Sequence, residues 1–63
     1  MPILHVHLMK GRNKEKKQRL VEELTKAVCH SLELVPENVT IILHEMEKEH
    51  YASSGILAVD RKP

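Results

Sequence analysis

The chain has 63 residues, enough for one small domain but too few to bury a large hydrophobic core without disulfides, metals or further subunits. Cys29 is its only cysteine, so a disulfide within the chain is excluded, and a free thiol is typical of a reducing compartment. The net charge of +1 at pH 7 selects no partner, while 41% hydrophobic residues with Tyr51 as the only aromatic one favour burial between subunits. We therefore expect a single domain over residues 1–63 that forms an obligate homo-oligomer.

The first predicted element is a strand over residues 3–9, because its side chains alternate between two faces. One face would carry Leu4, Val6 and Leu8, and the other Ile3, His5, His7 and Met9. Both faces are largely apolar, so we expect a helix to cover one and another subunit the other. The apolar run is too short for a signal peptide, and no stretch approaches membrane-spanning length. A cytoplasmic protein with no membrane partner is therefore expected.

A helix is predicted from about Lys14 to Leu34. Asn13 is a good N-cap residue, and the helix should end before Val35-Pro36, because a residue that precedes proline avoids the helical conformation. One helical face collects the residues Leu20, Val21, Leu24, Ala27, Val28, Ser31 and Leu32. The opposite face is charged.

A second strand is predicted over residues 39–46, which completes a β-α-β unit with parallel strands. Residues 52–55 are expected to form a loop, and residues 56–59 a short strand or hairpin arm. The fold class is therefore α+β. Two parallel strands and one helix are not stable alone, so other subunits must complete the sheet.

Pro2 begins the first strand, and its position allows two interpretations. Proline suits the first residue of a strand, where no N–H is needed. If Met1 is removed, however, Pro2 becomes a secondary amine at the chain terminus. An apolar pocket beside cations would lower the pKa of such an amine, and a neutral amine can act as a general base.

Arg12 follows Gly11 just before the predicted helix. A flexible glycine, free N–H groups and the positive end of the helix dipole favour anion binding, and arginine can clamp a carboxylate with two hydrogen bonds. The alternative is a solvated cation in a turn. Four further basic residues, Lys14, Lys16, Lys17 and Arg19, lie among acidic ones without interleaved aromatic residues, so we interpret them as a solvated face and expect no nucleic-acid partner.

His5 and His7 point to one side of the first strand, a spacing that metal sites use. A third ligand could come from His44 or Cys29, but no spacing matches a known zinc motif. We therefore favour histidines packed at a subunit interface and expect no metal. Glu45, Glu47 and Glu49 are interpreted as an exposed edge. Tyr51 either lines a pocket or is an interface aromatic, and the spacing leaves both open.

Taken in order, these features resemble the 4-oxalocrotonate tautomerase family. The matching pieces are the start Met1-Pro2-Ile3, the turn Gly11-Arg12, the long helix, and the second strand ending Glu45-Met46. His50-Tyr51 falls where the family has an aromatic residue after a similar polar turn. The resemblance covers nearly the whole chain, including its length.

The resemblance implies a β-α-β fold with a C-terminal hairpin, which dimerises into a four-stranded sheet with two helices and often assembles as a trimer of dimers. It implies that Pro2 is a general base, without a metal or organic cofactor. The base would shuttle a proton between the enol and keto forms of a 2-oxo acid. Arg12 would bind a substrate carboxylate, and Tyr51 would line the pocket.

Thr40 departs from the family pattern. It stands where the best-characterised tautomerases carry a second substrate-binding arginine, and a charged contact is worth about 1.5–3 kcal/mol against about 1 kcal/mol for a neutral hydrogen bond. We therefore expect weak activity on 4-oxalocrotonate-type dicarboxylates, or a different substrate. Lys48, His44 and Arg61 remain candidates for the missing charge. The alternative is a non-catalytic oligomer that keeps the fold, and a retained Met1 would favour it.

Overall fold

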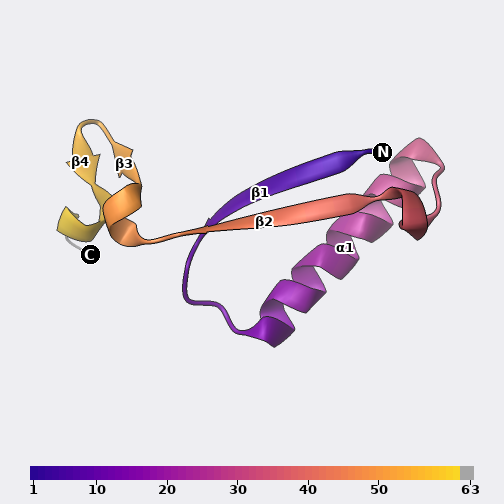
Figure 1. Cartoon of the computed structure of the whole chain (residues 1–63), viewed down its shortest axis with the longest axis horizontal. Helices are drawn as coiled ribbons and strands as arrows, with labels where there is room; N and C mark the ends of the chain where they lie inside the picture. Colours follow the sequence, from indigo (N-terminus) through magenta and orange to yellow (C-terminus); the bar gives the residue numbers. More distant parts are fainter. Residues whose placement is uncertain (62–63) are drawn as a thin grey trace.

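The computed structural model describes residues 1–61 and contains the predicted β-α-β unit. Strands β1 (Ile3–Met9) and β2 (Thr40–Met46) pair in parallel, with Ile3 opposite Thr40 and Met9 opposite Met46. Helix α1 (Lys14–Leu32) connects them and lies along the sheet (Figure 1). The second strand begins at Thr40 rather than at the predicted Val39. A short 3-10 helix, η1 (Pro36–Asn38), ends in a turn that uses the Val39 N–H.

Helix α1 begins where its cap was predicted and ends earlier than predicted. The Asn13 side chain accepts a hydrogen bond from the Lys16 N–H at 2.9 Å, which satisfies one of the free donors of the first turn. The predicted end at Leu34 is wrong by two residues. Glu33 adopts a left-handed conformation with φ 56°, and the N–H groups of Glu33 and Leu34 both donate to the Cys29 carbonyl. The last turn is thereby closed at Leu32.

The two faces of the sheet are buried to different extents. Leu4, Val6 and Leu8 of β1 are half-buried, together with Ile41 and Leu43 of β2, while Ile3 and Ile42 on the other face are 45% and 40% exposed. No side chain is fully buried anywhere in residues 1–61. One chain therefore does not enclose a hydrophobic core by itself.

The ion pair of Glu45 and Lys17 corrects one prediction. Alternation along β2 turns Glu45 toward α1, where its Oε1 lies 3.2 Å from the Lys17 Nζ, and both side chains are only about 30% exposed. As a whole residue Glu45 is exposed, as predicted, but it pairs with Lys17, which is half-buried and therefore not simply solvated. The pair joins the first turns of α1 to the end of β2.

Residues 47–61 form a C-terminal arm that extends beyond the ends of β1 and β2 (Figure 1). It contains η2 (Lys48–His50), a hairpin of β3 (Ala52–Ser53) and β4 (Ile56–Leu57), and η3 (Ala58–Asp60). Within the predicted loop over residues 52–55, Ala52–Ser53 is therefore strand β3 and only Ser54-Gly55 is a turn. Ser54 and Gly55 both have positive φ, as such hairpin turns require. The predicted arm over 56–59 forms a strand only at residues 56–57.

The chain is elongated for its size. Its radius of gyration is 14.8 Å, whereas a compact chain of this length has about 11 Å. It exposes 5,260 Å², about 1,100 Å² more than a compact protein of the same mass. No helix within residues 1–61 has the length and hydropathy to cross a membrane. The shape leaves apolar surface available for contact with other subunits.

Candidate active site

Pro2 and Thr40 lie together where both strands of the sheet begin. The Thr40 N–H donates to the Pro2 carbonyl at 3.1 Å, and this bond extends the ladder of β1 and β2 by one residue. Pro2 is half-buried and Thr40 is exposed. With Met1 attached, the Pro2 nitrogen belongs to a peptide bond and cannot accept a proton, because its lone pair is delocalised. Only the chain without Met1 offers an amine at this point.

Arg12 lies after β1, at the opposite end of the sheet. Gly11 before it has φ 130°, a conformation that side-chain-bearing residues rarely adopt, and this turn directs the chain from the strand toward α1. The exposed Arg12 side chain donates through Nη1 to the Met9 carbonyl at 3.1 Å. The guanidinium is thus fixed at one edge of the turn and remains accessible to an anion.

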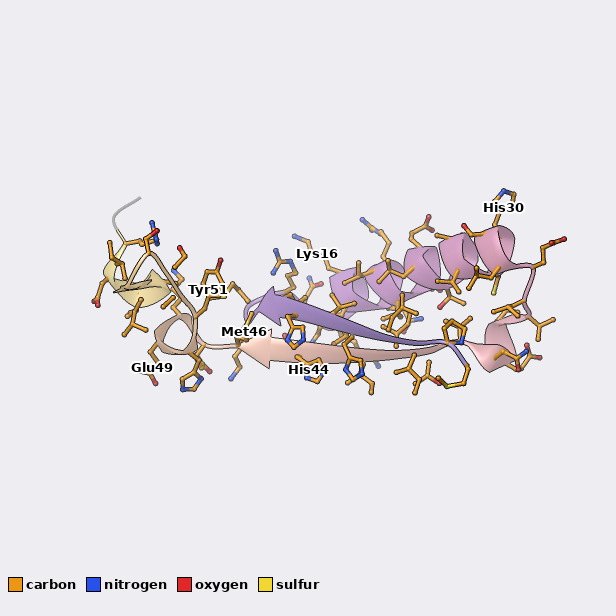
Figure 2. All side chains as sticks on the ribbon, turned by 90° about the horizontal axis from the view of Figure 1, so that it is seen from above. Lys16, His30, His44, Met46, Glu49 and Tyr51 are labelled. Carbon is orange, nitrogen blue, oxygen red and sulfur yellow. The ribbon has the colours of Figure 1, made fainter. Side chains whose placement is uncertain are left out.

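Tyr51 also lies at this second end, between η2 and β3. Its carbonyl accepts a hydrogen bond from the Ala58 N–H at 2.7 Å, which fixes the backbone of the arm. Tyr51 is 46% exposed. Its side chain is labelled in Figure 2. A large aromatic side chain this exposed is available for a pocket or for a neighbouring subunit.

The predicted site residues therefore form two groups in one chain. Pro2 and Thr40 are separated from Arg12 and Tyr51 by the length of β1, which is about 20 Å for seven residues of extended chain. A small acid cannot span that distance. A site that uses all four residues must combine the first end of one sheet with the second end of another copy.

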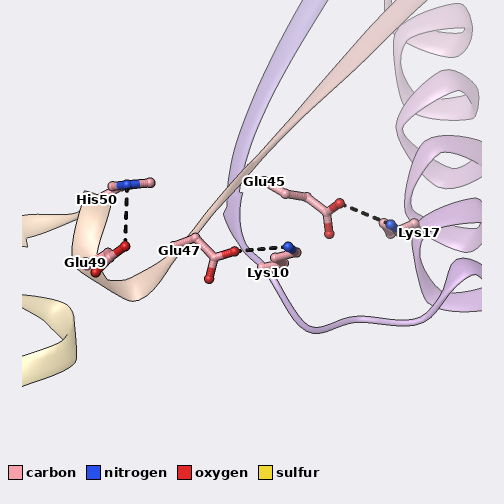
Figure 3. Close-up of polar contacts among 6 residues, drawn as sticks. All are labelled: Lys10, Lys17, Glu45, Glu47, Glu49 and His50. Atoms are coloured by element: carbon pink, nitrogen blue, oxygen red, sulfur yellow. Dashed lines mark hydrogen bonds and ion pairs between the residues drawn. The ribbon is translucent and has the colours of Figure 1, made fainter.

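Ion pairs surround the second end of the sheet (Figure 3). The Lys10 Nζ donates a hydrogen bond to the Glu47 Oε1 at 3.0 Å, and this bond to a carboxylate raises the pKa of Lys10. An open hollow of about 440 Å³ lies here; it is lined by Lys10, Met46, Glu47, Lys48, Glu49 and Val59. The hollow contains none of the predicted site residues.

Two of the candidates for the missing second cation already have partners. The Arg61 Nη2 donates to the Ser53 carbonyl at 2.7 Å and to its Oγ at 2.6 Å, so it holds the hairpin to the end of the arm. His44 stacks on His5 and His7. Lys48 lines the hollow described above. None of the three lies beside Pro2.

The histidines of β1 and β2 form a cluster of stacked rings. The His5 Nδ1 lies 2.8 Å from the His44 Nε2, which is a hydrogen bond between the two rings. Among residues 1–61, no group of three or more His, Cys, Asp or Glu side chains has an arrangement that would hold a metal ion. Cys29 lies half-buried on α1.

Comparison with known proteins decides the family. The sequence model described as "Tautomerase enzyme" matches residues 2–61, almost the whole chain. This chain belongs to the tautomerase family. It is 42% identical over 55 residues to a probable tautomerase of Halalkalibacterium halodurans, which covers 87% of this chain and 90% of that protein. It is 40% identical over 58 residues to a 2-hydroxymuconate tautomerase of Pseudomonas putida, which covers 92% of each.

Solved structures show the same tautomerase fold. A 4-oxalocrotonate tautomerase homologue superposes with a TM-score of 0.89 at 36% identity and covers all of both chains. A second structure, of a heterohexameric 4-oxalocrotonate tautomerase from Chloroflexus aurantiacus, has a TM-score of 0.91 at 24% identity and covers 98% of this chain and 100% of that one. The resemblance to 4-oxalocrotonate tautomerases that the sequence suggested is therefore confirmed, as is the β-α-β fold.

Proposed function

We propose that this chain is a cofactor-independent tautomerase that moves a proton between the enol and keto forms of a 2-oxo acid. The observation that carries the proposal is the match to tautomerase enzymes, which begins at Pro2 itself and continues to residue 61. Relatives named as tautomerases, among them one that acts on 2-hydroxymuconate, support the same reaction class. Pro2 would be the general base.

The reaction needs one group that accepts and returns a proton. The Pro2 amine removes the proton from the enol hydroxyl, the carbonyl forms, and the ammonium returns the proton to carbon. No atom is gained or lost, and the amine is regenerated. The half-buried position of Pro2 supports this role, because partial desolvation favours the neutral amine that the first step requires.

Arg12 and Tyr51 would bind the substrate from a neighbouring copy. The exposed guanidinium at the Gly11 turn can hold a carboxylate with two hydrogen bonds, and the Tyr51 ring supplies an apolar wall with a hydroxyl at its edge. The separation along β1 supports an assembly in which such copies meet. We therefore propose a homo-oligomer built from dimers, either a dimer alone or a trimer of dimers.

Thr40 would set the charge preference of the substrate. It lies beside Pro2 and offers one hydroxyl where the family pattern has a guanidinium. A second carboxylate would then lose a charge-assisted contact worth about 1.5–3 kcal/mol and keep a neutral one worth about 1 kcal/mol. The proposed substrates are therefore enol or 2-oxo acids with a single carboxylate in preference to dicarboxylates.

Ketonisation assays test this function on protein whose first residue has been verified as Pro2 by intact mass. Substrates are phenylenolpyruvate, with one carboxylate, and 2-hydroxymuconate, with two. The variant Pro2→Ala should lose about 10²–10⁴-fold in kcat, the usual contribution of a positioned general base. Arg19→Ala, on the exposed helix face, is the matched control and should behave as wild type. Unchanged rates for Pro2→Ala would overturn the proposed mechanism.

A non-catalytic oligomer with the same fold is the second candidate. The neutral Thr40 favours it, because this substitution removes a contact that a dicarboxylate tautomerase needs. The N-terminus distinguishes the two functions. A mature chain that still begins with Met1 in its native cell supports the scaffold, and a chain that begins with Pro2 supports the enzyme.

A further inference from the structure

The face of the sheet away from α1 carries three histidines. By alternation and by the parallel register, this face holds His5 and His7 of β1 and His44 of β2. Figure 2 shows His44 on the side of the sheet opposite α1. We call this surface the histidine face; its side chains are those of Ile3, His5, His7, Met9, Thr40, Ile42, His44 and Met46.

The His44 ring contacts each of the other two rings. His44 stacks on His7 with 4.5 Å between ring centroids and on His5 with 5.1 Å, both within 17° of parallel. The 2.8 Å bond between the His5 Nδ1 and the His44 Nε2 needs a proton on one nitrogen and a lone pair on the other. If both rings are protonated, both nitrogens carry hydrogen, so the bond breaks and stacked cations repel each other.

No countercharge is available on the histidine face within residues 1–61. None of its three histidines lies within 4.0 Å of a carboxylate oxygen there, and the other side chains of the face are apolar except Thr40. Glu45 points the other way and pairs with Lys17 of α1, while Glu47 of the arm pairs with Lys10. Protonated rings on this face would therefore depend on water for solvation.

Another copy of the same chain is the occupant that fits this face. Ile3 and Ile42 expose 45% and 40% of their surface on it, and no side chain in residues 1–61 is fully buried. The whole chain, its arm included, exposes about 1,100 Å² more than a compact protein of the same mass, which is more than the roughly 800 Å² that each partner buries in a stable protein interface. A second copy would cover the apolar side chains and remove the water that protonated rings need.

We propose that copies of this chain pack on the histidine face and that protonation of its histidines releases them. Imidazole is the side chain that ordinarily changes charge between pH 5 and 8, so assembly weakens as the pH falls through this range. The proposal rests on the proposed assembly and not on the tautomerase reaction. The smaller species expected at low pH is the dimer that edge-to-edge strand pairing would hold together.

Sedimentation equilibrium from pH 8.0 to 5.5 at constant ionic strength tests this directly. For wild type we expect the dissociation constant to rise at least tenfold per pH unit in the acidic part of this range, the slope for one proton taken up on release. The triple variant His5→Gln/His7→Gln/His44→Gln should change less than about threefold over the same range, since glutamine does not titrate. His30→Gln/His50→Gln, which alters histidines of α1 and η2, is the matched control and should follow wild type.

Three results would overturn the proposal. They are a wild-type mass that is constant to pH 5.5, a triple variant that dissociates like wild type, and loss of the helical circular dichroism signal before dissociation. If the triple variant does not assemble at pH 8.0, His44→Gln alone replaces it, because His44 contacts both other rings. The pH at which half of the assembly has dissociated should then be half a unit lower for His44→Gln than for wild type, which supports the proposal. An unchanged pH of half-dissociation contradicts it. Activity is not measured, so this test is independent of the proposed reaction.

Discussion

Pro2 illustrates how one residue can serve a structural and a chemical role. Its carbonyl continues the ladder between β1 and β2, so the strand-starting role inferred from backbone chemistry is seen in the structure. That bond uses the oxygen and leaves the nitrogen for chemistry once Met1 is gone. The catalytic role stays a prediction that follows from the family and from the position of the residue.

Thr40→Arg tests the proposed charge preference at this end of the sheet. The new guanidinium should raise kcat/KM for 2-hydroxymuconate at least about fivefold relative to phenylenolpyruvate, because a charged hydrogen bond exceeds a neutral one by roughly 1 kcal/mol or more. Gln18→Arg adds the same charge on the exposed face of α1 and is the control. If the ratio of kcat/KM for 2-hydroxymuconate to kcat/KM for phenylenolpyruvate is the same in wild type and Thr40→Arg, residue 40 does not contact the second carboxylate.

Arg12→Ala tests carboxylate binding at the other end of the sheet. KM for phenylenolpyruvate should rise at least tenfold, since a charged contact worth about 1.5–3 kcal/mol is lost. Arg12→Lys keeps the charge but cannot form two parallel hydrogen bonds to a carboxylate. Its KM should therefore lie between the KM of wild type and that of Arg12→Ala. Steady-state kinetics at a protein concentration that keeps the assembly intact provides the measurement. A KM that does not change would exclude Arg12 from the site.

At the scale of elements, the sequence predicted the parts that depend on local patterns. Alternation located β1 to the residue, and Asn13 located the start of α1. The end of α1 was missed because its left-handed residue is Glu33 and not the usual glycine, and only the hydrogen bonds to Cys29 reveal it. The sequence predicts one arm of the hairpin within residues 56–59, but it assigns Ala52–Ser53 to a loop, because a two-residue strand is too short for a period to appear.

The left-handed conformation of Glu33 at the end of α1 predicts that Glu33→Gly stabilises the protein. Glycine adopts the left-handed conformation without the cost of about 1 kcal/mol that other residues carry, so the variant should be more stable by about 0.5–1 kcal/mol. Glu22→Gly, in the middle of the same helix, should be less stable by about 1 kcal/mol. Denaturant unfolding at one fixed protein concentration compares them. A loss of stability in Glu33→Gly would contradict the assigned conformation.

For the molecule as a whole, the sequence predicted an incomplete monomer and could not show how the site is divided. Composition alone indicated that one chain lacks a closed core, and the structure has no fully buried side chain within residues 1–61. The sequence does not predict that the site residues divide between two ends of the sheet, because a family pattern names residues without the distances between them. The parallel register of β1 and β2 shows which site residues lie at each end of the sheet.

Ile42→Glu tests whether the exposed sheet face is needed for assembly. A carboxylate on this face cannot be buried without a partner, so the variant should form smaller species than wild type at pH 8. Its activity should fall in parallel if the site combines residues of several copies. Light scattering after gel filtration measures the mass, and Glu22→Gln serves as a surface control. A wild-type mass for Ile42→Glu would place the subunit contacts elsewhere.

The most direct test of the central claim compares two chemically synthesised chains that differ only in Met1. One begins at Met1 and the other at Pro2, and ketonisation of phenylenolpyruvate is measured for both at equal mass of assembled protein. A tautomerase that uses the Pro2 amine predicts that the chain beginning at Pro2 is active and that the chain beginning at Met1 is at least 10²-fold slower. Equal rates for the two chains would contradict the claim, because an amide nitrogen cannot act as the base.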